Sequence, residues 1–470
     1  MNIARTSAIV FSNRFASLII SFLGIAIFAR ELGAAALGIF FLFQAALSSL
    51  QLFTNVGTRI SVEKRVSEGE EAADYLTTAI LLKLGIIILA SIPIFLLSGY
   101  IDGYIGLGVT EWLILALILN EFGSLTINVL KGELRVAEAA LINLLYTITW
   151  IGVGILLVYN DFGTFGLIYA IIIGYLAKLL VGLFAMDTGL GSPSVELAVS
   201  LFDYAKYSAI PEIDNYFHSW MDILIIGFIL TQAAVGAYEV AWRVAGPVML
   251  VASAIGTTIF PQISSFHSDG KTDEIGTLVS KSIVPSIIIV VPAFLGALLL
   301  STEILELIFG AEFTMAAVAL IILIAGKVPR AIRKITGLSL MGMDRPDLVT
   351  RAAIVEILTN IGLNIVLIYN FGIVGAAIGT TLSMVLGTFQ RVYYLSHLID
   401  IHVQYKQLIW CVLSSVGMYG VLYVIKTGTD ITTVPQLLLF VSLGASLYGL
   451  FILAYPSLRR EIVEQTKKII

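Results

Sequence analysis

The hydrophobic positions of this chain come in long unbroken runs rather than in alternation with polar ones. Each run lasts about 20 residues or more, which is the length that an α-helix needs to cross a bilayer, whereas a transmembrane β-strand needs only about 10 alternating residues. Short polar or glycine-rich segments separate the runs. The pattern predicts about fourteen membrane-spanning helices, at roughly 6–29, 38–60, 75–98, 109–131, 137–158, 163–186, 203–230, 234–260, 277–300, 314–340, 348–370, 372–397, 406–426 and 434–456.

Composition agrees with an all-α integral membrane protein. Hydrophobic residues make up 58% of the 470 residues and charged residues 13%, and the mean hydropathy is +0.98. The charged fraction is about half that of an average soluble domain, too little to give a chain of this size a solvated surface. Almost nothing remains for a soluble domain. The one cysteine, Cys411, lies within a predicted span, so the chain has no intrachain disulfide.

The lysines and arginines of the connecting loops predict an orientation. With a cytoplasmic N-terminus, the inner loops and tails hold about 17 of the 27 basic residues, whereas the outer loops hold only Arg30 and Lys426. By the positive-inside rule we therefore expect both termini in the cytoplasm. The basic residues assigned to inner loops include Arg59, Lys64, Lys131, Arg135, Lys271, Arg345, Arg391 and Lys406.

The chain contains an internal repeat. With a shift of 210 residues, positions 113–160 align with 323–370 without a gap, and about thirteen of these pairs are identical. Tyr159-Asn160 matches Tyr369-Asn370, one residue is then deleted, and Gly163 matches Gly372.

This repeat predicts the domain organisation. Six spans per repeat give two lobes of parallel orientation, 1–200 and 201–400, around a central cavity. A terminal two-helix hairpin with a cytoplasmic tail occupies 401–470. Parallel repeats around a cavity are common in transporters, whose lobes rock against each other to open the cavity on alternate sides.

Four segments resemble a known family. They are ARELGAAALGIFFL at 29–42, GAYEVAWRVAGPV at 236–248, TTIFPQIS at 257–264 and YNFGIVGAAIGTTLS at 369–383. In this order and spacing they are similar to the polysaccharide transporter family of oligosaccharide flippases. That family belongs to the multidrug/oligosaccharidyl-lipid/polysaccharide (MOP) superfamily, which also holds lipid II flippases and multidrug and toxin extrusion proteins.

The resemblance covers nearly the whole chain and implies a function. A member of this family would move an oligosaccharide linked to polyprenyl or dolichyl phosphate or diphosphate from the cytoplasmic to the outer leaflet of the cell membrane, by alternating access. We expect a monomer whose partners are this lipid-linked oligosaccharide, membrane lipids and enzymes of glycan assembly.

An anionic headgroup needs cations within the membrane. A charge at the centre of a span costs about 2.5–3.5 kcal/mol, so it seldom faces lipid without a function. We predict that the headgroup binds to six basic residues of the spans, Arg14, Arg243, Lys327, Arg330, Arg333 and Lys334. For Arg14 and Arg243, the alternative is an interhelical ion pair with a residue such as Glu239 or Asp222. Lys83 and Lys178 are expected to extend to the membrane interface.

The densest basic group is the segment KVPRAIRK. On a helix, Lys327, Arg330 and Lys334 follow i, i+3 and i+7 and share one face, with Arg333 close by. The alternative is a cytoplasmic loop, because Pro329 can break a helix. The repeat favours the helix, since the matching segment 117–124 lies in the middle of a span.

The eleventh predicted helix carries a polar stripe. Glu356, Asn360 and Asn364 follow i, i+4 and i+8, and the matching positions of the first repeat hold Tyr146, Trp150 and Gly154. Further oxygen donors on neighbouring helices are Thr380, Thr381, Asp214 and Asp222. Oxygen ligands from three helices can hold a small hard cation, and some of the lipid II flippases that the chain resembles have a sodium site on these helices. One interpretation is therefore a sodium site formed by Asp222, Asn360, Asn364 and Thr380; the other is hydrogen bonding between helices.

Other classes of function are disfavoured. No P-loop motif is present, so we expect no nucleotide and no cofactor, and any energy would come from a sodium, proton or substrate gradient. A membrane glycosyltransferase or polymerase would need a sizeable outer loop with acidic residues, so we expect no enzyme. Multidrug efflux is the closest alternative, but its site would be apolar with one or two carboxylates, whereas cations dominate the buried charge here. Nucleic-acid binding is excluded because no soluble basic domain is present.

Overall fold

A computed structural model describes residues 3–55 and 58–456, and their side chains except for those of 3–5 and 204–215. Every regular element in these ranges is a helix. The all-α fold predicted from the sequence is therefore confirmed. The expected cytoplasmic tail falls on residues 457–470 and lies outside the described part of the chain.

The chain packs into two compact units, residues 1–236 and 237–470. The helices that begin in the first unit are α1 (Ile3–Asn55), α2 (Thr58–Glu68), α3 (Ala72–Leu96), α4 (Ser98–Ile105), α5 (Thr110–Gly132), α6 (Val136–Val158), α7 (Gly163–Ala185), α8 (Val195–Ile229) and α9 (Gln232–Ala245). Those of the second unit are η1 (Pro247–Met249), α10 (Leu250–Ser268), α11 (Thr272–Ile287), α12 (Val290–Phe309), η2 (Ala311–Ala316), α13 (Ala317–Ala325), α14 (Lys327–Gly342), α15 (Pro346–Ser396), α16 (Tyr405–Thr427) and α17 (Val434–Leu453). The predicted lobe bounds at 200 and 400 stay a prediction. The helix that was expected to open the second lobe, α8, packs on α1, α2 and α3 of the first unit.

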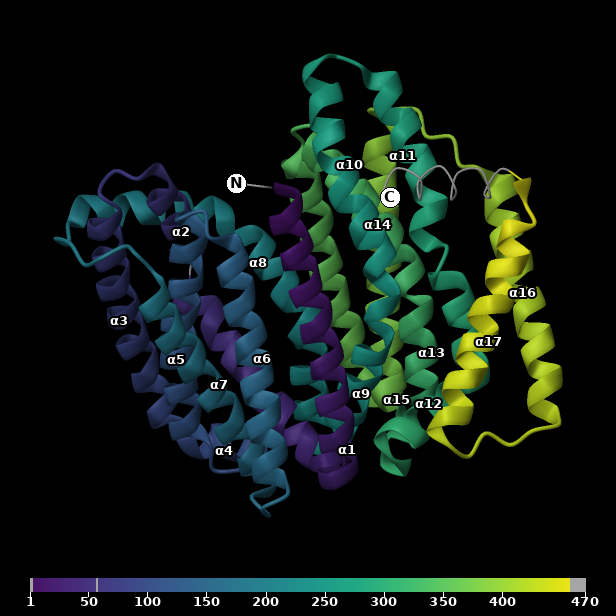
Figure 1. Cartoon of the computed structure of the whole chain (residues 1–470), viewed down its shortest axis with the longest axis horizontal. Coiled ribbons are helices and arrows are strands. Elements are labelled where there is room, and N and C mark those ends of the chain that lie inside the picture. The colour runs from purple at the N-terminus through teal and green to yellow at the C-terminus, as the bar shows by residue number, and fades with distance from the viewer. Residues whose placement is uncertain (1–2, 56–57, 457–470) are drawn as a thin grey trace. The chain divides into compact units, whose positions relative to one another are not determined.

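The number of spans agrees with the sequence analysis. Eleven helical segments of the described chain are long and apolar enough to cross a membrane. Two of them, α1 and α15, are divided by glycines with non-helical backbone angles, Gly33 and Gly372, and Figure 1 shows the two halves of α1 running in opposite directions. The end of α8 adds a shorter apolar helix, Tyr216–Ile229. Eleven, two and one make the fourteen predicted spans, and the chain is a multi-pass membrane protein.

The glycines of the repeated turn share an unusual backbone conformation. The φ angle is 55° at Gly163 and 58° at Gly372, a region that residues with a Cβ atom avoid. The first copy has one extra residue, Asp161, whose φ is also positive at 64°, and there the chain leaves the helix between α6 and α7. The second copy lacks this residue, and α15 continues through the bend.

A second pair of matched loops also has the same geometry. Leu134 and Asp344, 210 residues apart, have φ angles of 62° and 56°. Each precedes an arginine of a loop. Hydrogen bonds to Glu138 raise the pKa of Arg135, and hydrogen bonds to Asp347 raise the pKa of Arg345. The internal repeat is therefore visible in the backbone as well as in the sequence.

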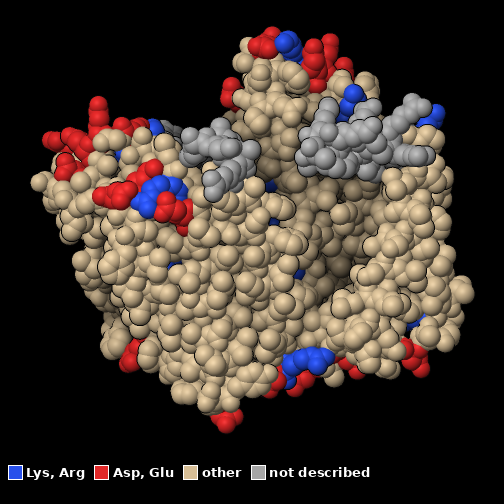
Figure 2. Space-filling view, viewed as in Figure 1, with Lys and Arg blue, Asp and Glu red and all other residues tan. Residues whose placement is uncertain are grey.

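Charged side chains lie mainly at the ends of the helices. Figure 2 shows, on the visible face of each unit, charged atoms at the upper and lower ends and an almost uncharged surface between them. Large apolar side chains such as Phe184 and Leu439 are exposed within spans. Such exposure is unfavourable in water but not in lipid, so this surface is the one that the bilayer covers.

Small residues bring neighbouring helices close together. A Cβ atom at Gly182 of α7 would lie 2.0 Å from Oγ1 of Thr126 in α5. In the second unit, a Cβ atom at Gly387 would lie 2.1 Å from Oε2 of Glu356, on the other half of α15. Close backbone approach of this kind is common between transmembrane helices. Here it leaves room for buried polar side chains.

Candidate functional site

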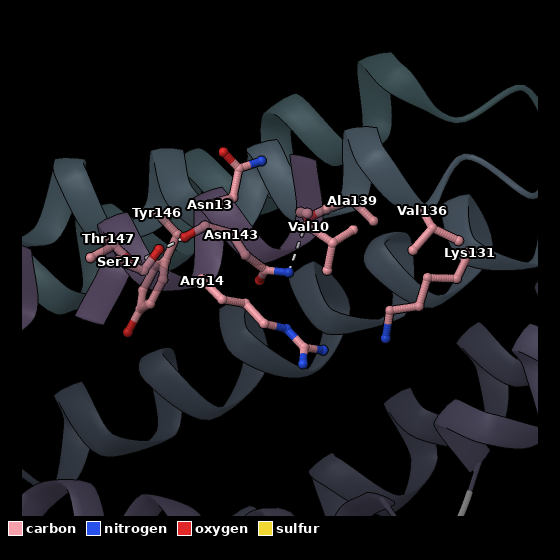
Figure 3. Close-up of a pocket in the computed structure, with 11 residues that line it drawn as sticks. Val10, Asn13, Arg14, Ser17, Lys131, Val136, Ala139, Asn143, Tyr146 and Thr147 are labelled. Atoms are coloured by element: carbon pink, nitrogen blue, oxygen red, sulfur yellow. Dashed lines mark hydrogen bonds between the residues drawn. The ribbon is translucent and has the colours of Figure 1, made fainter. Parts of the chain in front are cut away.

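A pocket of about 390 Å³ lies in the first unit between α1, the end of α5 and the start of α6. Its polar lining consists of Asn13, Arg14, Ser17, Lys131, Asn143, Tyr146 and Thr147. Figure 3 shows the charged ends of Arg14 and Lys131 on the same side of the pocket. Two of the lining side chains are cations and none is a carboxylate. Arg14 thus lies at a cavity, and its role in binding a headgroup stays a prediction.

A buried acidic group lies in the same unit. Glu121 of α5 is fully buried, and its Oε1 and Oε2 atoms lie 2.8 Å from Nη2 of Arg59 and 2.6 Å from Nζ of Lys83. Lys83 is itself fully buried. The expectation that Lys83 extends to the membrane interface is wrong, because a carboxylate inside the helix bundle compensates its charge.

Lys178 of α7 is held by neutral groups next to the pocket. Its Nζ atom donates to Oδ1 of Asn120 at 2.5 Å and to Oγ of Ser124 at 3.1 Å. It also lies 5.5 Å and 5.1 Å from the ring centroids of Tyr146 and Tyr175, which stack on each other. Since Tyr146 lines the pocket, Lys178 lies behind the pocket wall. The expectation that it extends to the interface is also wrong.

In the second unit, the segment KVPRAIRK is helical. It forms the start of α14, and Pro329 occupies the first turn, where a missing N–H removes no intrahelical hydrogen bond. The residues 311–342 together are long and apolar enough for a span. The alternative that this segment is a loop is therefore wrong.

The cations of α14 point to different neighbours. Nζ of Lys327 and Cζ of Arg330 lie 3.8 Å and 5.3 Å from the ring centroid of Trp242 in α9. The stem of Lys334 packs on α10 instead, because a Cβ atom at Gly256 would lie 3.3 Å from its Cγ. Of the three residues predicted to share a face, Lys327 and Arg330 have a common aromatic neighbour. The binding of a headgroup by Lys327, Arg330 and Lys334 stays a prediction.

The fourth cation of this segment, Arg333, binds a buried carboxylate. Glu356 of α15 is fully buried, and its two oxygens lie 2.5 Å from Nη1 of Arg333 and 2.8 Å from Nη1 of Arg391. Gly387 provides the room for this carboxylate. The assignment of Arg391 to an inner loop is wrong, because this residue lies inside α15 and is only 2% exposed.

Arg243 has an acidic neighbour on its own helix. Its Nε atom lies 2.8 Å from Oε1 of Glu239, one turn earlier in α9. This pair was the alternative to a cavity-lining role, although it forms within one helix rather than between two. Asp222, the other suggested partner, lies in α8 of the first unit. The role of Arg243 in binding stays a prediction.

Three of the four residues suggested for sodium lie together. Nδ2 of Asn360 donates to Oγ1 of Thr380 at 3.0 Å and to Oγ of Ser383 at 3.3 Å. Nδ2 of Asn364 donates to Oδ1 of Asn360 at 3.1 Å. The two bonds of Asn360 connect the two halves of α15, as the second interpretation, hydrogen bonding between helices, expects, whereas the bond between Asn364 and Asn360 lies within one half.

The fourth residue of the predicted sodium site, Asp222, belongs to the first unit. The side chain of Asp214, a further oxygen donor in the sequence, lies outside the described residues. Within the described ranges, no three His, Cys, Asp or Glu side chains form a group that could hold a metal ion. The sodium site stays a prediction.

The sequence did not predict four residues of these clusters as site residues: Glu121, Lys131, Trp242 and Arg391. A signal existed for Glu121, because a glutamate in the middle of a span needs a cationic neighbour. Lys131 ends its span and has the appearance of an ordinary loop lysine. No sequence pattern distinguishes Trp242 from the other aromatic residues of the spans.

Comparison with protein families gives one match of more than half the chain. The family model described as "Polysaccharide biosynthesis protein" matches residues 7–318. A relative from Haloferax volcanii, named "Probable low-salt glycan biosynthesis flippase Agl15", is 43% identical over 459 residues, covering 98% of this chain and 97% of that protein.

Solved structures are similar in fold. One is the lipid II flippase MurJ in an inward closed conformation, with a TM-score of 0.80 and 17% identity, covering 97% of this chain and 99% of that one. Another is a multidrug resistance MATE family transporter of the MOP superfamily in an inward-facing conformation. Its TM-score is 0.63 at 15% identity, covering 81% of this chain and 94% of that one. At these identities the likeness concerns the fold alone.

Proposed function

Because the chain belongs to the family of polysaccharide biosynthesis proteins, we propose that it is a flippase that moves a lipid-linked oligosaccharide across a membrane. The observation that carries this proposal is the 43% identity, over nearly the full length of both chains, to a protein named as a glycan biosynthesis flippase. The motifs quoted above agree with it. The chain acts as a transporter rather than as an enzyme.

The charges of the spans support an anionic substrate. The pocket of the first unit contains two cations and no carboxylate, and Lys327 and Arg330 of the second unit lie over an aromatic ring. The phosphate or diphosphate of the substrate binds to such cations while the isoprenoid tail stays in the bilayer. The sugars need a hydrated path, which alternating access of two lobes provides.

We further propose the setting of this transport. The protein lies in the cell membrane with both termini in the cytoplasm, and it moves its substrate towards the outer leaflet. Enzymes that assemble the oligosaccharide supply the substrate. Transport is coupled to sodium bound near Asn360, Asn364 and Thr380.

Multidrug efflux is not a second candidate, because its support is a likeness of fold alone.

A reconstituted system tests the flippase function. Purified protein is placed in liposomes with a fluorescent oligosaccharide linked to a short polyprenyl diphosphate, and an impermeant reductant quenches the probe of the outer leaflet. With active protein, quenching should proceed beyond the outer-leaflet fraction. Replacing Arg243 by glutamine should slow this phase by about tenfold or more, because the charge-assisted hydrogen bond that Arg243 is proposed to donate to the phosphate is lost.

A control variant and two further conditions separate the alternatives. Lys271→Gln also removes a cation that lies 2.8 Å from a carboxylate, that of Asp269, but in an exposed loop, and it should leave the rate unchanged. Replacing sodium by a large inert cation should slow transport. Movement of a cationic dye without movement of the lipid probe would show that the flippase proposal is wrong.

A further inference from the structure

The pocket of the first unit has two cations whose hydrogen-bonding capacity is largely unused. Arg14 makes no hydrogen bond or ion pair with any residue that the structure describes. The ammonium of Lys131 lies 3.8 Å from Oε2 of Glu63 and 3.4 Å from Oδ1 of Asn128. Both distances exceed the roughly 2.7–2.9 Å of a strong charge-assisted bond. The two side chains can therefore donate to a ligand.

A buried amide donor lies in the same pocket. Within the described part of the chain, Nδ2 of Asn13 has no acceptor although it is shielded from solvent. The other amide, Nδ2 of Asn143, donates to the carbonyl oxygen of Ala139, and the hydroxyl of Thr147 donates to the carbonyl oxygen of Asn143. A buried donor without an acceptor is unfavourable. Asn13 is thus the group that a ligand with acceptor oxygens would satisfy.

The start of α6 adds positive potential. This 23-residue helix begins at Val136, which lines the pocket, and no side chain caps its first turn. The N-terminus of a helix carries partial positive charge and exposed N–H groups, and it favours anions. The acidic residue of this turn, Glu138, is held by Arg135 and does not line the pocket. Lys178 lies behind Tyr146, which lines the pocket, and its ammonium adds positive charge near the pocket.

The rest of the pocket lining is apolar. It consists of Val10, Val136, Ala139 and Ala140. On the neighbouring surface of α1, Phe11 and Phe15 stack with their ring centroids 6.3 Å apart, and both are exposed. An anion site next to an exposed apolar surface in a membrane span suits a ligand with a phosphate at one end and a hydrocarbon chain at the other.

We propose that this pocket binds the phosphate group of an isoprenoid phosphate lipid. Arg14 and Lys131 are its cationic ligands and Asn13 its amide donor. The proposal rests on the proposed function, since it assigns the phosphate end of the transported substrate to a site within the first unit. Lys131, in the last turn of α5, is the cationic ligand of this pocket that was not among the headgroup ligands predicted from the sequence.

Binding to the full-length protein in nanodiscs tests the site. Three probes are compared: a short polyprenyl phosphate, the matching polyprenol without phosphate, and glucose 1-phosphate without an isoprenoid chain. We expect the polyprenyl phosphate to bind tighter than both, and its affinity to fall with added salt. Lys131→Ala should weaken it by about tenfold or more, as expected for a charge-assisted hydrogen bond.

Lys64→Ala is the matched control. Lys64 also lies in the first unit, its side chain is 42% exposed against 37% for Lys131, and it is 3.7 Å from a carboxylate, as Lys131 is 3.8 Å from one. It does not line the pocket, so its removal should not change the affinity. Equal losses of affinity in the two variants would show that the lipid phosphate is attracted to positive charge in general, and the proposed site would be wrong.

Asn13 provides a test that does not depend on removing a cation. Asn13→Asp keeps the size of the side chain but places a carboxylate where the phosphate would bind, so it should weaken binding more than Asn13→Leu does. Thermal unfolding of both variants confirms that they fold. Unchanged binding in Asn13→Asp would overturn the proposal.

The remaining outcomes separate the site from the function. If the wild type flips the fluorescent oligosaccharide lipid but binds polyprenyl phosphate independently of Lys131 and Asn13, the site is wrong and the flippase function stands. If polyprenyl phosphate binds as proposed but the fluorescent oligosaccharide lipid is not flipped, the function is wrong and the site stands. If glucose 1-phosphate binds as tightly as polyprenyl phosphate in a Lys131-dependent manner, the ligand is a free sugar phosphate and the lipid assignment is wrong.

Discussion

Two glutamates, Glu121 and Glu356, organise the buried charge of the molecule. Each is fully buried, and each uses both oxygens to hold two cations from other helical segments. The attraction of buried opposite charges offsets the free energy of taking them out of water only while all partners are present. Loss of the carboxylate would leave two cations close together in a medium of low dielectric constant.

Glu356→Ala should therefore destabilise the protein. We expect a loss of about 3–5 kcal/mol in the free energy of unfolding, the range found when one partner of a buried ion pair is removed. Glu303→Ala is the control in the same unit, because its pair with Lys426 is partly exposed and should contribute about 1 kcal/mol or less. Chemical unfolding in detergent, followed by tryptophan fluorescence, measures both.

A further variant identifies the cause of this loss. If charge is responsible, replacing Glu356, Arg333 and Arg391 together by apolar residues of similar size should restore much of the lost stability. A triple variant that is less stable than Glu356→Ala would show that shape, not charge, governs this cluster.

At the scale of the helices, Gly372 determines how α15 bends. Its φ of 58° lets two spans follow each other with no connecting loop. The same bend brings the half that carries Asn360 and Glu356 next to the half that carries Thr380 and Gly387. The polar cluster of the second unit thus depends on the conformation of one residue.

Gly372→Ala should accordingly cost about 1–2 kcal/mol in unfolding free energy, because a Cβ atom is strained at positive φ. Gly362 lies in the same helix with helical angles and open space around it. Gly362→Ala should be neutral or should stabilise the helix by up to about 1 kcal/mol. Equal effects of the two substitutions in the same unfolding assay would contradict the role assigned to Gly372.

The sequence predicted the helices better than their partners. Hydrophobic runs determine which segments enter the membrane, and so the spans and the repeat followed from the sequence alone. Helical spacing placed Lys327 and Arg330 on one face, but it gave no information about the helix that this face meets. Lys83, Lys178 and Arg391 were misassigned for the same reason, since their buried partners come from distant parts of the chain.

At the scale of the whole molecule, the loop charges predict the orientation in the membrane. Arg135 and Arg345 occupy matched loops of the repeat, and each lies between a residue of positive φ and the first residue of a helix. A parallel repeat requires matched loops to lie on the same side of the membrane. Orientation of one loop therefore determines the orientation of the other.

Cysteine labelling tests this orientation. Single cysteines at Lys64, Arg135, Lys271, Arg345 or Lys406, in a Cys411→Ala background, should resist an impermeant thiol reagent added to intact cells. A cysteine at the exposed Asp430, between α16 and α17, should react with it. Labelling of two or more of the first group from outside would show that the predicted orientation is wrong.

The cluster around Glu121 also has a consequence for biosynthesis. Glu121 follows Lys83 by 38 residues, so at about 5–20 residues per second the ribosome produces the lysine some 2–8 s before its carboxylate. A helix with an uncompensated lysine enters lipid poorly, and α3 is therefore expected to leave the translocation machinery together with α5. In the second unit, Glu356 emerges 23 residues after Arg333 and 35 before Arg391. Arg333 is therefore without its carboxylate for a shorter time than Lys83 is, and Glu356 has already been synthesised when Arg391 leaves the ribosome.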